Sequence, residues 1–203
     1  MMAQSVVRLL LGVVFLCLGY SSVAAQGQRH PDTIQVLVVY HSLSGNTEIM
    51  AKSVAAGARG VPDVRVVLKK VGEVTADVLF SSDALVVGSP VYWSNMSGEV
   101  KIFFDRWQFE FGVFPEFKMR NKVGAAFATG GQVSSGKELT MLTILAAMLG
   151  NQMIVVSGGG AFGASATTEG DSPGIDEKEK AEAWALGRRV AEVAWVVKRG
   201  QQR

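Results

Sequence analysis

A short polar turn carries the most recognisable chemistry in this sequence. It places hydroxyl and amide side chains around one glycine: Ser42, Leu43, Ser44, Gly45, Asn46 and Thr47. These side chains can donate hydrogen bonds to an anion, and Gly45 would let the backbone approach a phosphate closely. The turn is therefore a candidate phosphate site, although it contains no lysine or arginine.

The segments on either side of the turn favour the same interpretation. Residues 34–40 are rich in apolar, β-branched side chains, which is typical of a buried parallel strand. Residues 47–59 carry apolar side chains at helical spacing. The N–H groups of a first helical turn, together with the helix dipole, attract anions. The alternative is that Ser44 or Asn46 simply caps this helix.

The rest of the chain alternates strands with helices. Apolar strands are predicted at residues 33–40, 64–69, 84–88, 123–129 and 153–157. Helices are predicted at residues 47–59, 75–82, 97–107, 138–149 and 176–198. This order predicts one α/β domain, a three-layer sandwich in which helices cover both faces of a doubly wound, five-stranded parallel sheet. Ligands bind such sheets beyond the carboxyl ends of the strands, where the strand order reverses.

Two further loops are expected at that edge of the sheet. The third strand is followed by Pro90, Val91, Tyr92, Trp93 and Asn95, and the fourth leads into Thr129, Gly130, Gly131 and Gln132. Each large aromatic side chain offers roughly 150–250 Å² of surface, so two in one loop indicate a use for them. Alternatively, Tyr92 and Trp93 form a subunit contact or fill the core. The loop after the fourth strand is small enough for its N–H groups to approach a planar, oxygen-rich ring.

A phosphate site, an aromatic wall and a loop of backbone donors suit flavin mononucleotide (FMN). The phosphate would occupy the turn at residues 42–47. The isoalloxazine ring would lie against Tyr92 or Trp93, with its pyrimidine edge on the backbone of the other loops. The sequence therefore predicts an FMN site built from all fifteen residues named above.

From about residue 33 to residue 194, the chain resembles the flavodoxin-like proteins. Within these it is most similar to the NAD(P)H:quinone oxidoreductases of the tryptophan-repressor-binding-protein type. The matching motifs are VVYHSLSGNTE, GSPVYWSNMSGEVKIFFD, ATGG followed by SGKELT, and FGASATTEGD. The resemblance implies that residues 42–47 bind the FMN phosphate, that residues 91–93 flank the ring, and that residues 129–132 contact its polar edge.

The chain also departs from that family. Where the family has a histidine that touches the flavin, near the end of the fourth helix, this chain has Gly150 and Asn151. The family also has a longer insertion between strands two and three than this chain has. At residues 108–117, this chain differs from the glycine-rich segment that the family usually has there. The resemblance implies a homo-oligomer, and the missing insertion leaves open whether this is a dimer or a tetramer.

The expected function is FMN-dependent transfer of two electrons from NADH or NADPH to a quinone-like acceptor. The flavin would carry the chemistry, so no catalytic side chain is expected. The alternatives are a flavodoxin-type electron carrier without its own substrate and a flavodoxin-like scaffold that has lost FMN. Carriers tend to be strongly acidic, whereas loss of Arg8 with the signal peptide would leave 19 basic and 18 acidic residues, a net charge of +1 that favours the enzyme. The sequence contains no stripe of basic residues, which argues against a nucleic-acid partner.

The first 25 residues are typical of a secretory signal peptide. Arg8 precedes an apolar run at residues 9–18, and Val23, Ala24 and Ala25 provide small side chains before a cleavage point. Residues 26–203 would form the flavodoxin-like domain, exported to the periplasm or secreted. The alternative is an uncleaved membrane anchor at about residues 6–25. One cysteine and two histidines argue against a disulfide framework and a zinc site.

Overall fold

The computed structural model describes residues 33–171 and 174–201. The predicted signal peptide, residues 1–25, lies outside the described residues. Within the described residues, no helix combines the length and apolarity that crossing a bilayer requires.

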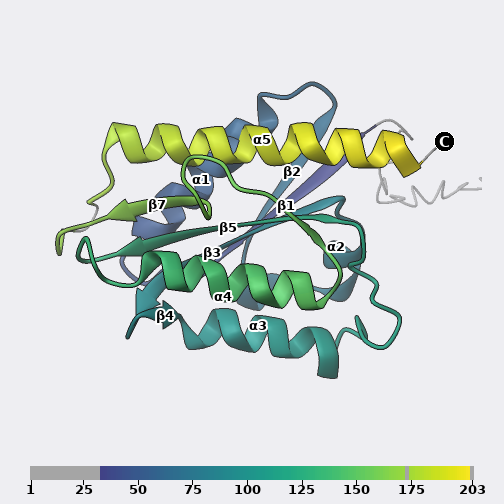
Figure 1. Ribbon diagram of the computed structural model, residues 1–203, viewed down its shortest axis with the longest axis horizontal. Coiled ribbons are helices and arrows are strands. Elements are labelled where there is room, and N and C mark those ends of the chain that lie inside the picture. Colours follow the sequence, from purple (N-terminus) through teal and green to yellow (C-terminus); the bar gives the residue numbers. More distant parts are fainter. Residues whose placement is uncertain (1–32, 172–173, 202–203) are drawn as a thin grey trace, which may run out of the picture. The chain divides into compact units, whose positions relative to one another are not determined.

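A parallel sheet forms the centre of the domain and confirms the predicted fold (Figure 1). Its strand order is β2-β1-β3-β5-β6. The strands are β1 (Ile34–Tyr40), β2 (Val64–Lys70), β3 (Ala84–Tyr92), β5 (Val123–Gly130) and β6 (Ile154–Val155). The order reverses between β1 and β3, which is the place where such sheets bind ligands, beyond the carboxyl ends of the strands.

The fifth position of the sheet differs from the prediction. A continuous strand at residues 153–157 is wrong, because β6 ends at Val155. The chain returns as β7 (Ala164–Thr167), which pairs with the carboxyl half of β5 while β6 pairs with the amino half. Three consecutive glycines at residues 158–160 explain the break, since glycine weakens a strand. Gly163 permits the return, because a Cβ there would overlap the carbonyl oxygen of Ala126.

Helices cover both faces of the sheet (Figure 1). One face carries α1 (Asn46–Arg59) and α5 (Glu177–Gln201). The other carries η1 (Val71–Glu73), α2 (Ala76–Phe80), α3 (Gly98–Phe109) and α4 (Lys137–Gly150). Alternate residues of β1 therefore enter two separate cores: Val36 and Val38 pack under α1 and α5, whereas Leu37 and Val39 pack on the opposite side.

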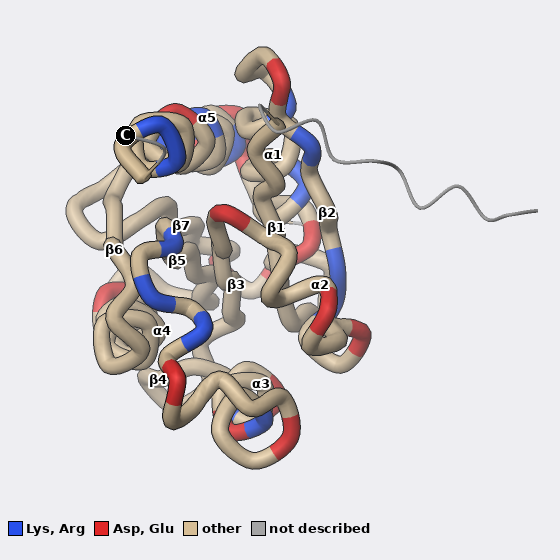
Figure 2. Tube along the Cα trace, turned by 90° about the vertical axis from the view of Figure 1, so that its right-hand side faces the viewer, with Lys and Arg blue, Asp and Glu red and all other residues tan. Residues whose placement is uncertain are grey.

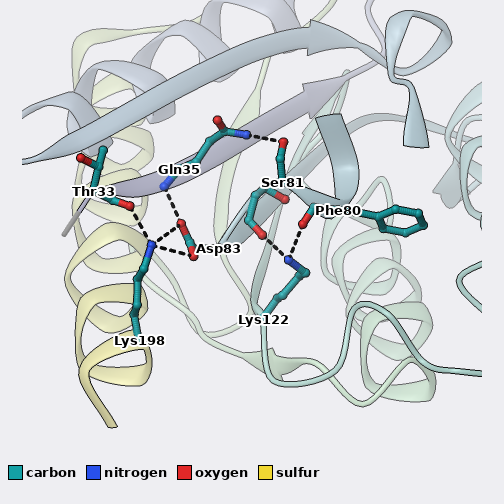
Figure 3. Close-up of polar contacts among 8 residues, drawn as sticks. Thr33, Gln35, Phe80, Ser81, Asp83, Lys122 and Lys198 are labelled. Carbon is teal, nitrogen blue, oxygen red and sulfur yellow. Dashed lines mark hydrogen bonds and ion pairs between the residues drawn. The ribbon is translucent and has the colours of Figure 1, made fainter. Parts of the chain in front are cut away.

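A polar network ties together the amino edge of the sheet, at the opposite ends of the strands from the candidate loops. Asp83 accepts a hydrogen bond from the backbone N–H of Gln35 at 2.7 Å and pairs with Lys198 at 3.2 Å. Lys198 also donates to the carbonyl of Thr33 at 2.8 Å, and Lys122 donates to carbonyl groups at the end of α2 (Figure 3). Viewed toward this amino edge, the backbone carries lysine and arginine positions interspersed with aspartate and glutamate positions (Figure 2). The network fixes the starts of β1 and β3.

Helices α1 and α5 approach each other through two glycines. A Cβ added to Gly57 would overlap the carbonyl oxygen of Trp184, and one added to Gly187 would overlap that of Val54. Each backbone therefore lies directly against the other helix. This contact holds α1 in place on the sheet, and the candidate phosphate turn lies at its amino end.

We expect Gly57→Ala and Gly187→Ala each to lower the free energy of unfolding by about 1–3 kcal/mol through overpacking. The steric cost should exceed the gain of roughly 1 kcal/mol that alanine has over glycine in a helix. Urea unfolding followed by circular dichroism measures the change. Gly200→Ala is the control, because a Cβ there meets no atom within 4 Å. Stability unchanged in all three variants would contradict the close packing.

Candidate functional site

The turn after β1 is held by backbone geometry and not by a side-chain cap. Gly45 is the N-cap of α1, with a φ of 89°, and no side chain caps the helix. The alternative in which Ser44 or Asn46 merely caps the helix is therefore wrong. The hydroxyl of Ser42 accepts a hydrogen bond from the N–H of Gly45 at 3.1 Å. Leu43 and Ser44 are exposed, and a Cβ on Gly45 would meet no atom within 4 Å. The turn thus opens onto empty space.

Asn46 joins this turn to a distant loop. Its side-chain amide donates to the carbonyl of Asp171 at 3.0 Å, and its side-chain oxygen accepts from the N–H of Gly174 at 2.8 Å. The side chain is 5% exposed. Asn46 therefore positions the segment after β7, while the backbone N–H groups of the first helical turn have no acceptor within the helix.

A buried pair of hydroxyl groups joins the turn to the loop after β5. The hydroxyl oxygens of Thr47 and Thr129 lie 2.8 Å apart, and both side chains are buried. Pro90 pairs in register with Thr129, so β3 delivers its own loop to the same place. The three predicted loops therefore meet at the carboxyl edge, as the parallel sheet requires.

The loop after β3 is a tight hairpin. Strand β3 continues to Tyr92 and pairs with β4 (Asn95–Met96), so that Trp93 and Ser94 form a two-residue turn. Their φ values are 50° and 64°, a left-handed conformation in which hairpin turns usually have Asn and Gly. The side chain of Trp93 is 101% exposed. A bulky residue held in this conformation without any burial is the kind of strain that clusters at functional sites.

Tyr92 and its neighbours form the base of the hairpin. The ring of His41 lies edge-on to that of Tyr92, at 6.1 Å between centroids. The Nδ1 atom of His41 lies 2.9 Å from the hydroxyl of Ser97 and 3.3 Å from Glu99 Oε2. Burial, and then the Glu99 carboxylate, raises the pKa of Tyr92 above its ordinary value. The Tyr92 phenol therefore stays protonated at neutral pH, and it offers the site an aromatic surface and not a base.

Asn95 pairs in register with Tyr92, and its side chain makes its hydrogen bonds to α4 and to the next residue. Its side-chain oxygen accepts hydrogen bonds from the hydroxyl of Thr143 and the N–H of Met96, both at 2.8 Å. It lines a separate cavity of about 470 Å³ between α3 and α4, together with Asn151. Val91, which pairs with Met96, is half-buried and packs on the core beneath the hairpin. The Asn95 side chain is thus engaged with α4, and its contact with FMN stays a prediction.

A larger cavity lies beside the loop after β5. Its volume is about 700 Å³, within the range of roughly 300–1,000 Å³ usual for small-molecule sites. It is lined by Gly131, Gln132, Val133, Ser135, Glu169 and Gly170. Gly131 and Gln132 were predicted site residues, whereas Gly130 is buried beneath Ser135. Glu169 and Gly170 were not predicted as site residues, although they belong to the FGASATTEGD motif that matches the family.

Sequence reasoning also missed a buried lysine. Lys137 begins α4 and is 4% exposed. Its ammonium group donates to the carbonyls of Gln132 and Val133, at 3.0 and 3.1 Å, and to the hydroxyl of Thr167 at 2.7 Å. One signal was available: a cation in the first helical turn opposes the helix dipole. Among the described residues, His, Cys, Asp and Glu form no cluster suited to a metal ion.

Comparisons with known proteins agree with this geometry. A family model described as NADPH-dependent FMN reductase matches residues 69–168. A flavodoxin of Clostridium saccharobutylicum is 31% identical over 160 residues, which cover 78% of this chain and 96% of the relative. An NAD(P)H dehydrogenase (quinone) of Chromohalobacter salexigens is 30% identical, covering 79% and 96%. The WrbA-like flavodoxin structure of Agrobacterium tumefaciens has a TM-score of 0.68 at 26% identity, covering 80% and 98%.

The chain belongs to the flavodoxin-like NAD(P)H:quinone oxidoreductase family. The family resemblance of the sequence motifs is confirmed, and with it the oxidoreductase class. The alignments with the two relatives differ in length. The alignment with the quinone dehydrogenase runs over 197 residues, yet covers nearly the same share of this chain as the 160-residue alignment with the flavodoxin. The quinone dehydrogenase of Chromohalobacter salexigens thus contains segments that have no counterpart in the aligned part of this chain.

Relief of the backbone strain at the hairpin tip should stabilise the protein without ligand. We expect Trp93→Asn to raise the free energy of unfolding by about 1 kcal/mol, because asparagine tolerates the left-handed conformation better than tryptophan. Little apolar burial is lost, since the Trp93 side chain is fully exposed. Denaturant unfolding without added FMN measures the effect. The control is Leu43→Asn, another exposed apolar residue, for which we expect no gain; a loss of stability in Trp93→Asn would contradict the strain.

Proposed function

We propose that this protein is an FMN-dependent oxidoreductase that takes two electrons from NADH or NADPH and passes them to a quinone-like acceptor. The observation that carries the proposal is the 2.8 Å contact between Thr47 and Thr129, which joins the turn after β1 to the end of β5, where Pro90 of β3 pairs in register with Thr129. The names of the matched family model and of the quinone dehydrogenase relative support the same activity.

The residues present fit FMN. The open face of Gly45, the exposed Ser44 and the first-turn N–H groups of α1 suit a phosphate. Tyr92 and Trp93 provide aromatic surface at the rim, and the exposed backbone at Gly131 allows close approach of a ring, because a Cβ there would meet no atom within 4 Å. When bound, FMN supplies a ring that takes up a hydride and returns two electrons. The protein residues would bind and orient FMN, with no side chain required as acid or base.

The second candidate function is a flavodoxin-type carrier. It is favoured by the 31% identity to a flavodoxin and by the absence of the extra segments that the quinone dehydrogenase contains. The near balance of charge argues for the enzyme, because carriers are commonly acidic and are steered electrostatically onto their partners.

We also propose that the protein is exported. Residues 1–25 support this, with an apolar run and small residues before Gln26. An uncleaved anchor is the alternative. N-terminal sequencing of protein purified from the native source should begin at Gln26, and a chain beginning at Met1 would contradict cleavage.

The phosphate site predicts a specific effect of negative charge. We expect Ser44→Asp to weaken FMN binding by at least about a hundredfold, because a carboxylate about 4 Å from a phosphate costs roughly 4 kcal/mol at an effective dielectric constant near 20. Flavin fluorescence titration of the apoprotein measures the change. Ser44→Asn is the matched control, similar in size but neutral, and should bind FMN far more tightly than Ser44→Asp. Equal affinities for both variants would contradict a phosphate at this turn.

Rapid-mixing kinetics test the activity. We expect anaerobic NADH or NADPH to bleach the bound flavin directly, without an added reductase, and benzoquinone to restore the colour. Both half-reactions should proceed at rates compatible with turnover. A flavin-loaded protein that is not bleached by either nucleotide would be a carrier, and a protein that takes up no FMN in excess would be a scaffold.

A further inference from the structure

The buried ammonium group of Lys137 has only neutral acceptors. All three hydrogens of an ammonium group are needed to reach the carbonyls of Gln132 and Val133 and the hydroxyl of Thr167. Lys137 forms no ion pair among residues 33–171 and 174–201. A buried charge without a counter-ion is expensive, so its retention calls for a role beyond packing.

The carboxylates in this region do not cancel that charge by direct contact. Glu179 accepts hydrogen bonds from the backbone N–H groups of Thr167 and Asp176, at 2.7 and 3.1 Å. Glu138 and Glu169 are exposed, where solvent screens them. The amino end of α4 adds partial positive charge of the same sign as Lys137. The positive charge of Lys137 therefore lies behind the loop at residues 131–136, and the exposed Glu169 is the carboxylate residue among those that line the 700 Å³ cavity.

Lys137 also orients the peptides of this loop. In a trans peptide the C=O and N–H bonds point in opposite directions. The carbonyls of Gln132 and Val133 turn toward the ammonium group. The N–H groups of Val133 and Ser134 therefore lie on the other side of the loop, where they can donate outward. One side chain thus supplies positive charge and orients the peptides of a loop whose residues Gln132 and Val133 line the cavity.

We propose that Lys137 stabilises the negative charge that the FMN ring acquires on two-electron reduction. This inference rests on the proposed function. Hydride transfer from C4 of the nicotinamide breaks one C–H bond and leaves NAD(P)⁺, and the ring gains two electrons and one proton, hence one negative charge. The quinone-like acceptor then takes two electrons and two protons, one from the ring and one from solvent. Lys137 acts as a positioning residue through the loop and its field.

This role would bias the site toward the enzyme and away from the carrier. Positive charge near the ring favours its anionic, fully reduced state over states with less negative charge. In a one-electron carrier the same charge would act against the half-reduced state, because it favours full reduction. Lys137 thereby links the loop after β5 to the choice between the two candidate functions.

Two substitutions separate charge from hydrogen bonding. Lys137→Gln keeps two N–H donors for the loop carbonyls but removes the charge, whereas Lys137→Arg keeps the charge. The measurement is the Kd of oxidised FMN and of dithionite-reduced FMN for each apoprotein. We expect Lys137→Gln to weaken binding of reduced FMN about tenfold more than that of oxidised FMN. This corresponds to a fall of about 30 mV in the two-electron midpoint potential. Lys137→Arg should leave the ratio unchanged.

The controls distinguish the possible failures. Lys101→Met removes an exposed lysine that pairs with Asp105, and should not change the ratio of the two Kd values. Equal weakening of both redox forms in Lys137→Gln would mean that Lys137 only holds the loop, which overturns this inference alone. A wild-type protein that binds neither form would overturn the proposed function as well.

Sulfite provides an independent test on the unaltered protein. Sulfite adds to the oxidised ring through its sulfur electron pair, and the ring of the adduct carries a negative charge without any hydride from a nicotinamide. We expect the FMN-loaded wild-type protein to bind sulfite at least about tenfold more tightly than free FMN does. Affinity no higher than that of free FMN would overturn the inference even if the Lys137 variants failed to fold.

Discussion

The hydrogen bond between Thr47 and Thr129 is the contact on which the site depends. It joins the first turn of α1 to the end of β5 through two buried hydroxyl groups 2.8 Å apart. Each hydroxyl satisfies the other, so loss of one would leave a buried polar group without its partner. Asn46 adds a second connection, to the segment after β7. These hydrogen bonds join the segments after β1, β5 and β7 into one rim at the carboxyl edge of the sheet.

The rim combines elements that would each be costly alone. The left-handed backbone at Trp93 stores strain, and the ammonium group of Lys137 is buried without an ion pair. Both lie at the carboxyl edge, whereas the amino edge is tied by the Asp83–Lys198 pair and its hydrogen bonds. The close packing of α1 on α5 fixes the helix whose amino end carries the turn at residues 42–47. The stabilising polar network therefore lies at the amino ends of the strands, and the candidate site lies at their carboxyl ends.

Much of the fold could be predicted from the sequence because burial periodicity is local. The apolar run at residues 34–40 and the helical spacing after it needed no distant information, and the parallel order placed the loops. The partner of Asn46 lies 125 residues away, so spacing could not reveal it. The Asn95 side chain turned toward α4 because Thr143 offers it a hydroxyl. The burial of Lys137 and the break after Val155 likewise depend on tertiary contacts.

The division of the outer strand into β6 and β7 has a consequence for the behaviour of the protein at high concentration. A long, regular outer strand exposes unpaired N–H and C=O groups and recruits strands from other molecules. Here the outermost position holds segments of only 2 and 4 residues, separated by a glycine-rich excursion. Neither segment is long enough to template an intermolecular sheet, so this border of the molecule resists aggregation.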